Sequence, residues 1–596
     1  MQESGSPAAN RTPRWLPWAL LAVLLLASAA FVLWVGRETV FRGDDWDLFL
    51  YRGGFNADVF LVPHNEHLSA LLVAAFKLIP AIAGPHYGAF RLALLGLDVA
   101  LAALFFVFAR ERVGDWVALL ATSPLLLMGA GSDNLLWPTE IGVVGSLACG
   151  MAVLILLDRV GTAAKAGACA ALTASIWFSS DGLFFLVCAG IWLLLSRERW
   201  RDLWIVAIPA ITYVAWYTGH GSSEFTAANL RAAPEFVLDS ATAGVSALTG
   251  IGSETGHPRT IGGLAGLLAL AALGAFALKT RPRITPRLVA IVALPVVSWA
   301  IIALGRADGG NPYAPRYVYA SALFILIAAL EIVRGKYLPR FFRGWKLAGL
   351  ALAVGLSLIF SAKLLVQEGD YWRSVSQYIH GRTAAIELTR RTIAPNMVLE
   401  PLPDMAHMTP GWFLNSVEKY GESPTGAPDI AGLGEPGRSA ADQVLAAGAP
   451  ARFVIAPRGT GPTGGPPRTD PGFRRPVTRG SCLVGRPHTP LSVLVPPSGI
   501  LIRPVDGTFA AIRLRRYASG YDQAPEQSVT YPALLAIAAD HSRVPWHARI
   551  VSPAGVSVCG ASAPARLRRG PLRPPSGNQH CLPMSLGEDE CRFSRY

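Results

Sequence analysis

Two adjacent carboxylates, Asp44 and Asp45, lie just beyond the first long apolar segment of the chain. A carboxylate held close to a substrate can act as a general base and remove a proton from a hydroxyl group. Like charges side by side raise one of the two pKa values, which suits proton transfer near neutrality. The pair therefore predicts an acid–base site, although an ordinary acidic loop beside a membrane has the same composition.

A second polar cluster further along the chain contains His64, Glu66 and His67. Two histidines spaced i, i+3 with a carboxylate between them could bind a divalent metal. The alternative is a helix start in which these side chains form interfacial hydrogen bonds. The apolar stretch that follows, residues 68–82, contains Lys77, so we expect an amphipathic helix that lies in the membrane interface.

Two arginines, Arg306 and Arg316, flank a short polar segment between two apolar runs, and Tyr317 is next to the second of them. A guanidinium group at a membrane boundary can hold a phosphate through paired, charge-assisted hydrogen bonds. Tyrosine is also common at this boundary as an anchor. The sequence therefore predicts either a lipid-phosphate site or an interfacial anchor here.

The composition of the 596-residue chain limits the elements that can position these residues. Hydrophobic residues make up 52% of the chain and charged residues only 16%, whereas soluble domains carry about 25% charged residues. This composition therefore disfavours a wholly soluble enzyme. A bilayer span needs about 20 apolar residues. Eleven candidate runs lie at 15–35, 91–109, 114–131, 140–157, 164–178, 182–195, 202–218, 261–279, 287–305, 316–333 and 345–363.

The positive charges alternate between the segments that connect these runs. Segments 1–14, 110–113, 158–163, 196–201, 280–286 and 334–344 carry arginines, whereas 132–139 and 179–181 carry no Lys or Arg. Positive charge marks the cytoplasmic side. The sequence therefore predicts a cell-membrane protein with residues 1–14 in the cytoplasm, a membrane domain at 15–365 with an outer loop at 36–90, and an extracytoplasmic C-terminus. The net charge of +13 is partly a topology signal, and nucleic acid is not an expected partner.

The composition changes sharply after residue 365, where Pro, Gly and Arg become frequent and long apolar runs stop. Residues 366–450 have helical patterns. Residues 451–560 contain short β-rich runs separated by turn residues, which favours a sandwich. Residues 561–596 form an Arg- and Pro-rich segment that we expect to be flexible. The predicted fold class is thus an α-helical polytopic membrane protein followed by a soluble outer region, part helical and part β-sandwich.

Four of the seven cysteines lie in this outer region, at Cys482, Cys559, Cys581 and Cys591. An even number of cysteines in an oxidising compartment fits disulfides. Four cysteines allow three pairings, and the sequence alone does not settle which occurs. Their placement favours Cys482–Cys559, which would tie together the ends of the β-rich part, and Cys581–Cys591 as a local pair.

The order of elements in residues 36–100 resembles a known superfamily. The segment begins with a first membrane helix and an outer loop with two aspartates. A juxtamembrane helix with a polar start follows, and then a second membrane helix that opens with Ala89-Phe90-Arg91-Leu92. This arrangement is similar to the GT-C integral membrane glycosyltransferases, including protein O-mannosyltransferase-like and aminoarabinose-transferase-like enzymes. The resemblance covers residues 1–365, and the Lys-poor, Ala- and Arg-rich composition suits an actinobacterial member.

The resemblance implies a polyprenyl-phosphate-linked sugar as donor, and a cell-envelope glycan, lipid or protein as acceptor. It also implies a catalytic acid in the first outer loop, at Asp44 or Asp45. The remaining outer-facing polar residues are then expected to bind substrate. They are Arg306, Arg316, Tyr317, His64, Glu66, His67, Asp133, Trp137 and Asp181.

The expected reaction is inverting glycosyl transfer at the outer face of the membrane. The sequence assigns no cofactor with certainty, and a divalent metal stays open. The alternative function is a polytopic transporter or lipid flippase, which predicts repeated halves and ionisable residues at mid-membrane. We find no clear internal repeat. The deeply placed carboxylate, Asp98, suits a hydrogen bond to a neighbouring helix better than a transport role.

Overall fold

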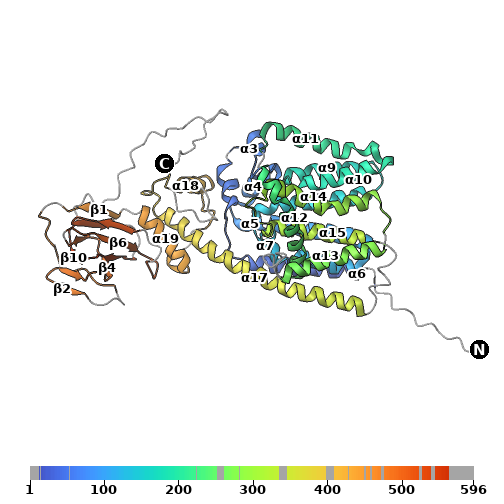
Figure 1. The fold of residues 1–596 in the computed structure, drawn as a ribbon. Coiled ribbons are helices and arrows are strands. Elements are labelled where there is room, and N and C mark those ends of the chain that lie inside the picture. Colours follow the sequence, from blue (N-terminus) through green and yellow to red (C-terminus); the bar gives the residue numbers. More distant parts are fainter. Residues whose placement is uncertain are drawn as a thin grey trace, which may run out of the picture. The chain divides into compact units, whose positions relative to one another are not determined.

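The structure is a computed structural model of the 596-residue chain. It divides into two units, Met1–Arg373 and Ser374–Tyr596, the first made of helices and the second of helices and strands (Figure 1). It describes residues 13, 15–52, 54–222, 225–250, 261–280, 282–334, 345–397, 408–426, 429–448, 451–456, 459–470, 476–505, 507–521, 526–537 and 544–562.

Each of the eleven predicted apolar runs coincides wholly or largely with a helix that begins in the first unit. These helices are α1 (Leu16–Val35), α5 (Tyr87–Val113), α6 (Asp115–Leu126), α8 (Ile141–Leu157), α9 (Thr162–Phe178), α10 (Gly182–Leu195), α11 (Trp204–His220), α13 (Ile261–Thr280), α14 (Pro286–Arg306), α15 (Pro315–Ile332) and the first part of α17 (Trp345–Leu388). By length and composition, seven described helices can cross a membrane: α1, α5, α8 with the turn before it, α13, α14, α15 and α17. The predicted polytopic helical architecture is confirmed.

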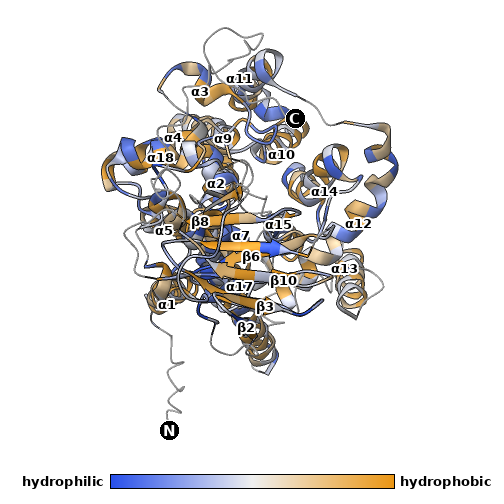
Figure 2. Cartoon of the chain, turned by 90° about the vertical axis from the view of Figure 1, so that its left-hand side faces the viewer, coloured by the Kyte–Doolittle hydropathy of each residue, from blue (hydrophilic) through white to orange (hydrophobic). Residues whose placement is uncertain are grey.

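The outward surfaces of these helices carry exposed apolar side chains. Leu26 on α1, Ile211 on α11 and Leu268 on α13 are each about two-thirds or more exposed. Figure 2 shows α1 and α10 coloured mainly as hydrophobic residues. Apolar side chains facing outward suit a lipid environment, where helices also satisfy their own backbone hydrogen bonds.

Shorter elements connect these helices at the end of the bundle that holds the predicted site. Between α1 and α5 lie α2 (Asp44–Trp46), the π-helical turn η1 (Asp47–Tyr51), α3 (Ala57–Leu61) and α4 (Ala70–Ala83). The stretch predicted to form an interfacial helix, residues 68–82, is helical as α4. Between α6 and α8 lie η2 (Gly129–Gly131), α7 (Ser132–Leu136) and η3 (Pro138–Glu140). The first unit also contains η4 (Arg197–Asp202), between α10 and α11, and the longer helix α12 (Ala227–Thr249), between α11 and α13.

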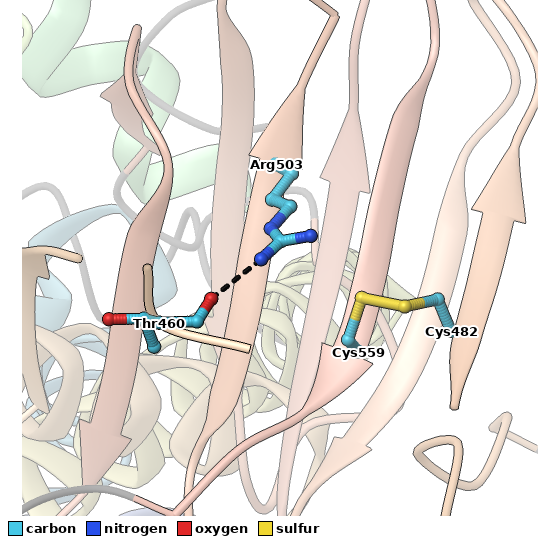
Figure 3. The surroundings of a disulfide bond; sticks show 4 residues. All are labelled: Thr460, Cys482, Arg503 and Cys559. Atoms are coloured by element: carbon cyan, nitrogen blue, oxygen red, sulfur yellow. Dashed lines mark hydrogen bonds between the residues drawn. A yellow bond between two sulfur atoms is a disulfide. The ribbon is translucent and has the colours of Figure 1, made fainter. Parts of the chain in front are cut away.

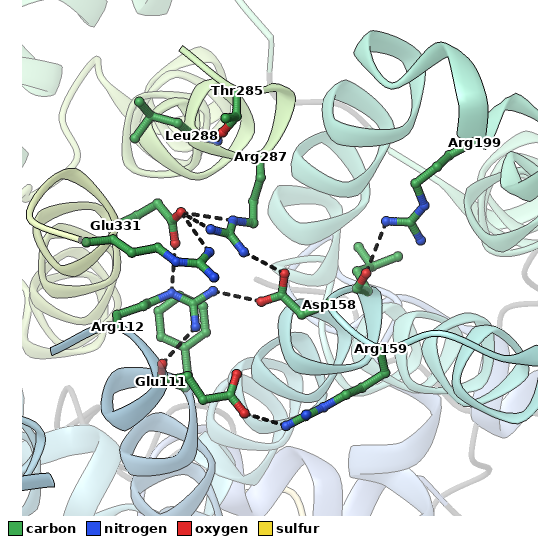
Figure 4. Close-up of polar contacts among 12 residues, drawn as sticks. Glu111, Arg112, Asp158, Arg159, Arg199, Thr285, Arg287, Leu288 and Glu331 are labelled. Atoms are coloured by element: carbon green, nitrogen blue, oxygen red, sulfur yellow. Dashed lines mark hydrogen bonds and ion pairs between the residues drawn. The ribbon is translucent and has the colours of Figure 1, made fainter. Parts of the chain in front are cut away.

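Four helices are joined at their other ends by a buried charge network (Figure 4). Arg112 of α5 contacts Glu331 of α15 at 2.7 Å and Asp158, at the end of α8, at 2.9 Å. Arg287 of α14 contacts the same two carboxylates, each at 2.7 Å. Arg112 and Glu331 are almost fully buried. Charges buried in this way need compensation by a partner, so the network fixes these four helix ends relative to one another.

The second unit contains the end of α17, two further α-helices and ten described strands. The helical elements are α18 (Pro410–Tyr420), η6 (Ile430–Gly432) and α19 (Glu435–Gly448), and the strands are β1 (Ala451–Ile455), β2 (Val477–Arg479), β3 (Cys482–Gly485), β4 (Leu491–Val495), β5 (Ile500–Pro504), β6 (Ala510–Arg515), β7 (Glu526–Val529), β8 (Ala533–Ile537), β9 (Trp546–Val551) and β10 (Val556–Gly560). Antiparallel pairing gives one sheet in the order β1-β8-β5-β10-β3-β2 and another in the order β4-β9-β6-β7.

Cys482 and Cys559 are joined by a disulfide in the larger sheet (Figure 3). They face each other directly across the β3–β10 pair, and Cys559 packs in a small core with Leu501 and Leu534. The bond therefore joins two neighbouring strands. The sequence argument placed these cysteines outside the strands, because it did not recognise the short strands β3 and β10. Cys581 and Cys591 lie outside the described residues.

Candidate active site

A cavity of about 430 Å³ lies in the first unit, among segments that connect its helices at one end of the bundle. Its wall comes from α2, the turn between α3 and α4, η3, the starts of α10 and α15, α11, and the end of α14. Its charged and histidine side chains are Asp44, His64, Glu66, His67, Glu140, Asp181, Arg306 and Arg316. Tyr317 lines the cavity as well. Residues that are far apart in the sequence are thus brought to one site.

Asp44 is the cavity-facing member of the aspartate pair. Its Oδ2 accepts a hydrogen bond of 2.7 Å from Nδ2 of Asn65 and lies 3.5 Å from Nε2 of His64. Burial disfavours the charged form, but His64, Asn65 and the charge of Arg316 outweigh burial and lower the pKa of Asp44 below its ordinary value. Asp44 is therefore ionised near neutral pH and held in one orientation.

The turn His64-Asn65-Glu66-His67 holds the partners of Asp44. The backbone N–H groups of His64 and His67 each donate to the carbonyl of the other, at 3.1 and 2.9 Å. The central residues, Asn65 and Glu66, have φ values of 47° and 69°, as a type I′ turn requires. Asn adopts positive φ more readily than most residues, whereas Glu does so with strain. Strained backbone is concentrated at functional sites.

Asp45 points away from the cavity and is fully buried. Its Oδ1 accepts hydrogen bonds from the backbone N–H and the hydroxyl of Thr139, at 3.1 and 2.7 Å, and its Oδ2 accepts from the backbone N–H of Arg42 at 3.1 Å. Burial raises the pKa of Asp45 to about 7, against the opposing effect of these hydrogen bonds. Asp45 therefore joins the segment between α1 and α5 to the segment between α6 and α8. The geometry favours Asp44 of the two candidate bases.

Asp133 and Trp137, predicted to contact the sugar or the acceptor, are not part of the cavity wall. Oδ1 of Asp133 lies 3.6 Å from Nη2 of Arg42, and Nε1 of Trp137 donates to the carbonyl of Arg42 at 3.3 Å. Burial raises the pKa of Asp133. Both side chains therefore contact Arg42 and do not line the cavity. Thr139 and Glu140 of the same segment line the cavity instead.

The two predicted phosphate-binding arginines both reach the cavity. Nη2 of Arg306 donates to the carbonyl of Asn65 at 3.4 Å, and the guanidinium of Arg316 lies 5.2 Å from the centroid of the Tyr317 ring. Arg316 is also close enough to Asp44 to lower the pKa of its carboxyl. Two guanidinium groups beside an ionised carboxylate make one part of the cavity attractive to an anion.

Asp181 and His67 form a second polar part of the wall. Ser179 donates from Oγ to Oδ2 of Asp181 at 3.1 Å, just before α10 begins. Burial lowers the pKa of His67, Asp181 opposes this effect, and Arg306 adds to it. His67 is therefore neutral near pH 7.

The rest of the wall is largely apolar or aromatic, and sequence reasoning missed it. It includes Tyr213 and Tyr217 of α11, whose ring centroids are 6.0 Å apart, and Ile301 and Ile302 of α14. The spacing of the two tyrosines, one helical turn apart, was the available signal, because i and i+4 side chains share a helix face. The cavity thus offers an apolar surface next to its charged part.

Two other sequence-based interpretations concern a metal and Asp98. Across the part of the chain that the structure describes, no three His, Cys, Asp or Glu side chains gather as a metal site. Asp98 accepts a 2.7 Å hydrogen bond from the hydroxyl of Tyr319, and both are buried. Asp98 therefore joins α5 to α15, in the structural role that the sequence favoured.

The chain matches no protein-family model and no curated protein. Among solved structures it is similar to ArnT from Cupriavidus metallidurans, in a crystal structure bound to undecaprenyl phosphate and in one of the apo state. The TM-score is 0.41 and the identity 12% in both cases. The matches cover 66% and 65% of this chain and 84% and 83% of those chains. A similarity this low assigns no role to any residue of this chain.

Proposed function

We propose that the chain is an integral membrane glycosyltransferase that moves a sugar from a polyprenyl-phosphate donor to a hydroxyl group of a cell-envelope acceptor. The reaction takes place at the outer face of the cytoplasmic membrane, with the N-terminus in the cytoplasm and the C-terminal unit outside. The observation that supports this proposal best is the meeting of Asp44 with Arg306 and Arg316 around one cavity. An oriented base and two phosphate-binding groups are what such a transfer needs.

Each of these residues has a role in the reaction. The carboxylate of Asp44 accepts the proton of the acceptor hydroxyl as the acceptor oxygen bonds to the anomeric carbon. The bond between that carbon and the phosphate oxygen breaks, and the electron pair leaves with the lipid phosphate. Arg306 and Arg316 offset the negative charge that grows on this phosphate. Attack opposite the leaving group inverts the anomeric carbon.

The apolar part of the wall suits the lipid portion of the donor. Ile301, Ile302 and Leu304 belong to α14, the helix that ends at Arg306. The same helix therefore presents apolar side chains and a phosphate-binding group in succession. An isoprenoid phosphate has the matching order of groups, because its apolar chain ends in an anionic phosphate.

Replacement of Asp44 tests the proposal. Membranes from cells that express each variant are supplied with the cells' own polyprenyl-phosphate sugars, and mass spectrometry follows loss of sugar from the lipid and its gain by the envelope acceptor. Asp44→Asn should slow transfer by about 10²–10⁴-fold, the usual effect of losing a general base. Asp58→Asn is the matched control, because Asp58 is exposed on the same outer loop and away from the cavity wall. Transfer by Asp44→Asn at the control's rate would contradict the proposal.

A further inference from the structure

The guanidinium of Arg42 is buried between two indole rings of the first unit. Its Cζ lies 3.2 Å from the ring centroid of Trp372, on α17, and 5.4 Å from that of Trp137. Asp133 is 3.6 Å away, yet Nε and Nη2 of Arg42 have no hydrogen-bond partner among the described residues. Aromatic faces attract a desolvated cation strongly, so Trp372 supplies much of what holds Arg42 in place.

The backbone of Arg42 is tied to the aspartate pair. The N–H of Arg42 donates to Oδ2 of Asp45 at 3.1 Å, and the N–H of Asp45 donates to the carbonyl of Arg42 at 2.9 Å. These reciprocal bonds close the loop that carries Asp44. A displacement of Arg42 therefore changes the direction in which Asp44 enters the cavity.

The same stretch of α17 fits closely against the end of α1, where this loop begins. Nη1 of Arg373 donates to the carbonyl of Val35 at 2.5 Å. A Cβ atom added at Gly369 would lie 2.5 Å from Cγ1 of Val35 and 2.8 Å from its carbonyl oxygen. Only glycine permits this approach without displacing one of the two helices.

We propose that Gly369 and Trp372 are positioning residues that hold the first outer loop so that Asp44 faces the substrate. This inference rests on the proposed glycosyl transfer. Because Arg306 and Arg316 lie on α14 and α15, the path from α17 to Asp44 does not pass through the phosphate-binding groups. Changes at Gly369 and Trp372 therefore lower kcat, and the KM for the donor stays nearly constant.

A pair of Gly→Ala variants tests the close approach. Alanine stabilises a helix interior relative to glycine, and Gly355→Ala on the same helix meets nothing within 4 Å. Gly355→Ala should keep the kcat of the unmodified protein. Gly369→Ala should lose at least about tenfold in kcat with donor KM within about twofold, because small displacements of a reacting group cost up to about 10²-fold.

A series at Trp372 tests the ring contact. Trp372→Leu removes the aromatic face and should lower kcat by about tenfold or more, whereas Trp372→Phe keeps a face and should recover kcat to within about threefold. Trp345→Leu, at the exposed start of the same helix, is the matched control and should leave kcat unchanged. Melting temperatures show that each variant is folded.

Two results would overturn the inference while leaving the proposed function intact. One is an unchanged kcat in folded Gly369→Ala. The other is an equal loss of kcat in Trp372→Leu and Trp372→Phe. The proposed function stands in either event if Asp44→Asn alone still slows transfer by about 10²–10⁴-fold. If the unmodified protein consumes no polyprenyl-linked sugar, the proposed function itself has failed, so the two failures are distinguishable.

Discussion

Asn65 donates a hydrogen bond of 2.7 Å to the cavity-facing carboxylate of Asp44, from a backbone conformation with φ of 47°. This contact and the nearby His64 keep the pKa of Asp44 low despite its burial. The side chain that orients the proposed base is therefore on a strained turn, where Asn is better tolerated than most residues.

Asn65→Asp should move the acidic limb of the rate profile to higher pH. Asp tolerates the same positive φ, but it loses the amide donor and places a like charge beside Asp44, which raises the pKa of that carboxyl. The base is active only when ionised, so activity is lost at a higher pH than in the unmodified protein. The measurement is kcat/KM between pH 4 and 8. Asn56→Asp, an exposed helix cap on the same loop, should leave the profile where it is.

Asp45 should make the protein less stable as the pH rises from about 4 to about 7. Its folded pKa is about 7, whereas an unfolded Asp has a pKa of about 3.9. In that range the folded state holds the proton more tightly, so stability falls with rising pH, by at most about 1.4 kcal/mol per pH unit. Melting temperatures across this range give the slope, and Asp45→Asn should flatten it. An identical slope in both proteins would mean that Asp45 does not titrate here.

Arg306→Lys and Arg316→Lys should each lower kcat/KM by about tenfold, which corresponds to about 1.4 kcal/mol of transition-state stabilisation. Lysine keeps the charge but lacks the fork that binds a phosphate at two points. Donor KM and kcat should both respond, because charge grows on the phosphate as the bond breaks. Arg283→Lys is the control, since Arg283 is exposed and away from the cavity. Unchanged kinetics in both variants would leave the two arginines as membrane anchors.

Glu331→Gln should destabilise the first unit by about 3–5 kcal/mol, the typical cost of removing one partner from a buried ion pair. Arg112 and Arg287 would then lose a shared carboxylate. The exposed pair of Glu111 and Arg159 provides the comparison, and Glu111→Gln should cost about 0–1 kcal/mol. Melting temperatures in detergent rank the two variants. Equal temperatures would show that the network contributes little.

Loss of the Cys482–Cys559 disulfide should destabilise the second unit by about 2–5 kcal/mol. The bond spans 77 residues of sequence and joins two neighbouring strands. A reductant should therefore lower the melting temperature of the unmodified protein but not of the double Cys→Ser variant. Cys149→Ser, at a free cysteine of the first unit, should keep the sensitivity to reductant. Free thiols at both positions in a non-reducing peptide map would refute the bond.

The positions of the membrane helices could be predicted because a long apolar run has few ways to satisfy its backbone in lipid. The strands were less predictable. The short β-rich runs of the sequence coincide with β1, β4, β5, β6, β8 and β9. By contrast, β2 and β7 are short and largely exposed. Such segments become strands only when they pair with a neighbouring strand. Their own residue types do not specify that pairing. The Cys482–Cys559 bond was predicted from the placement of the cysteines and is present, but the sequence did not predict that the two residues face each other across paired strands.

The sequence by itself determined a polytopic helical protein, and it predicted that polar residues from several connecting segments form one site. It also identified Asp44, His64, Arg306 and Arg316 as residues with suitable chemistry. Only the tertiary structure distinguished Asp44 from Asp45, because Thr139, 94 residues away, binds Asp45 and buries it. Burial and charge compensation depend on which distant side chains pack together, and neighbours in sequence can therefore have opposite environments.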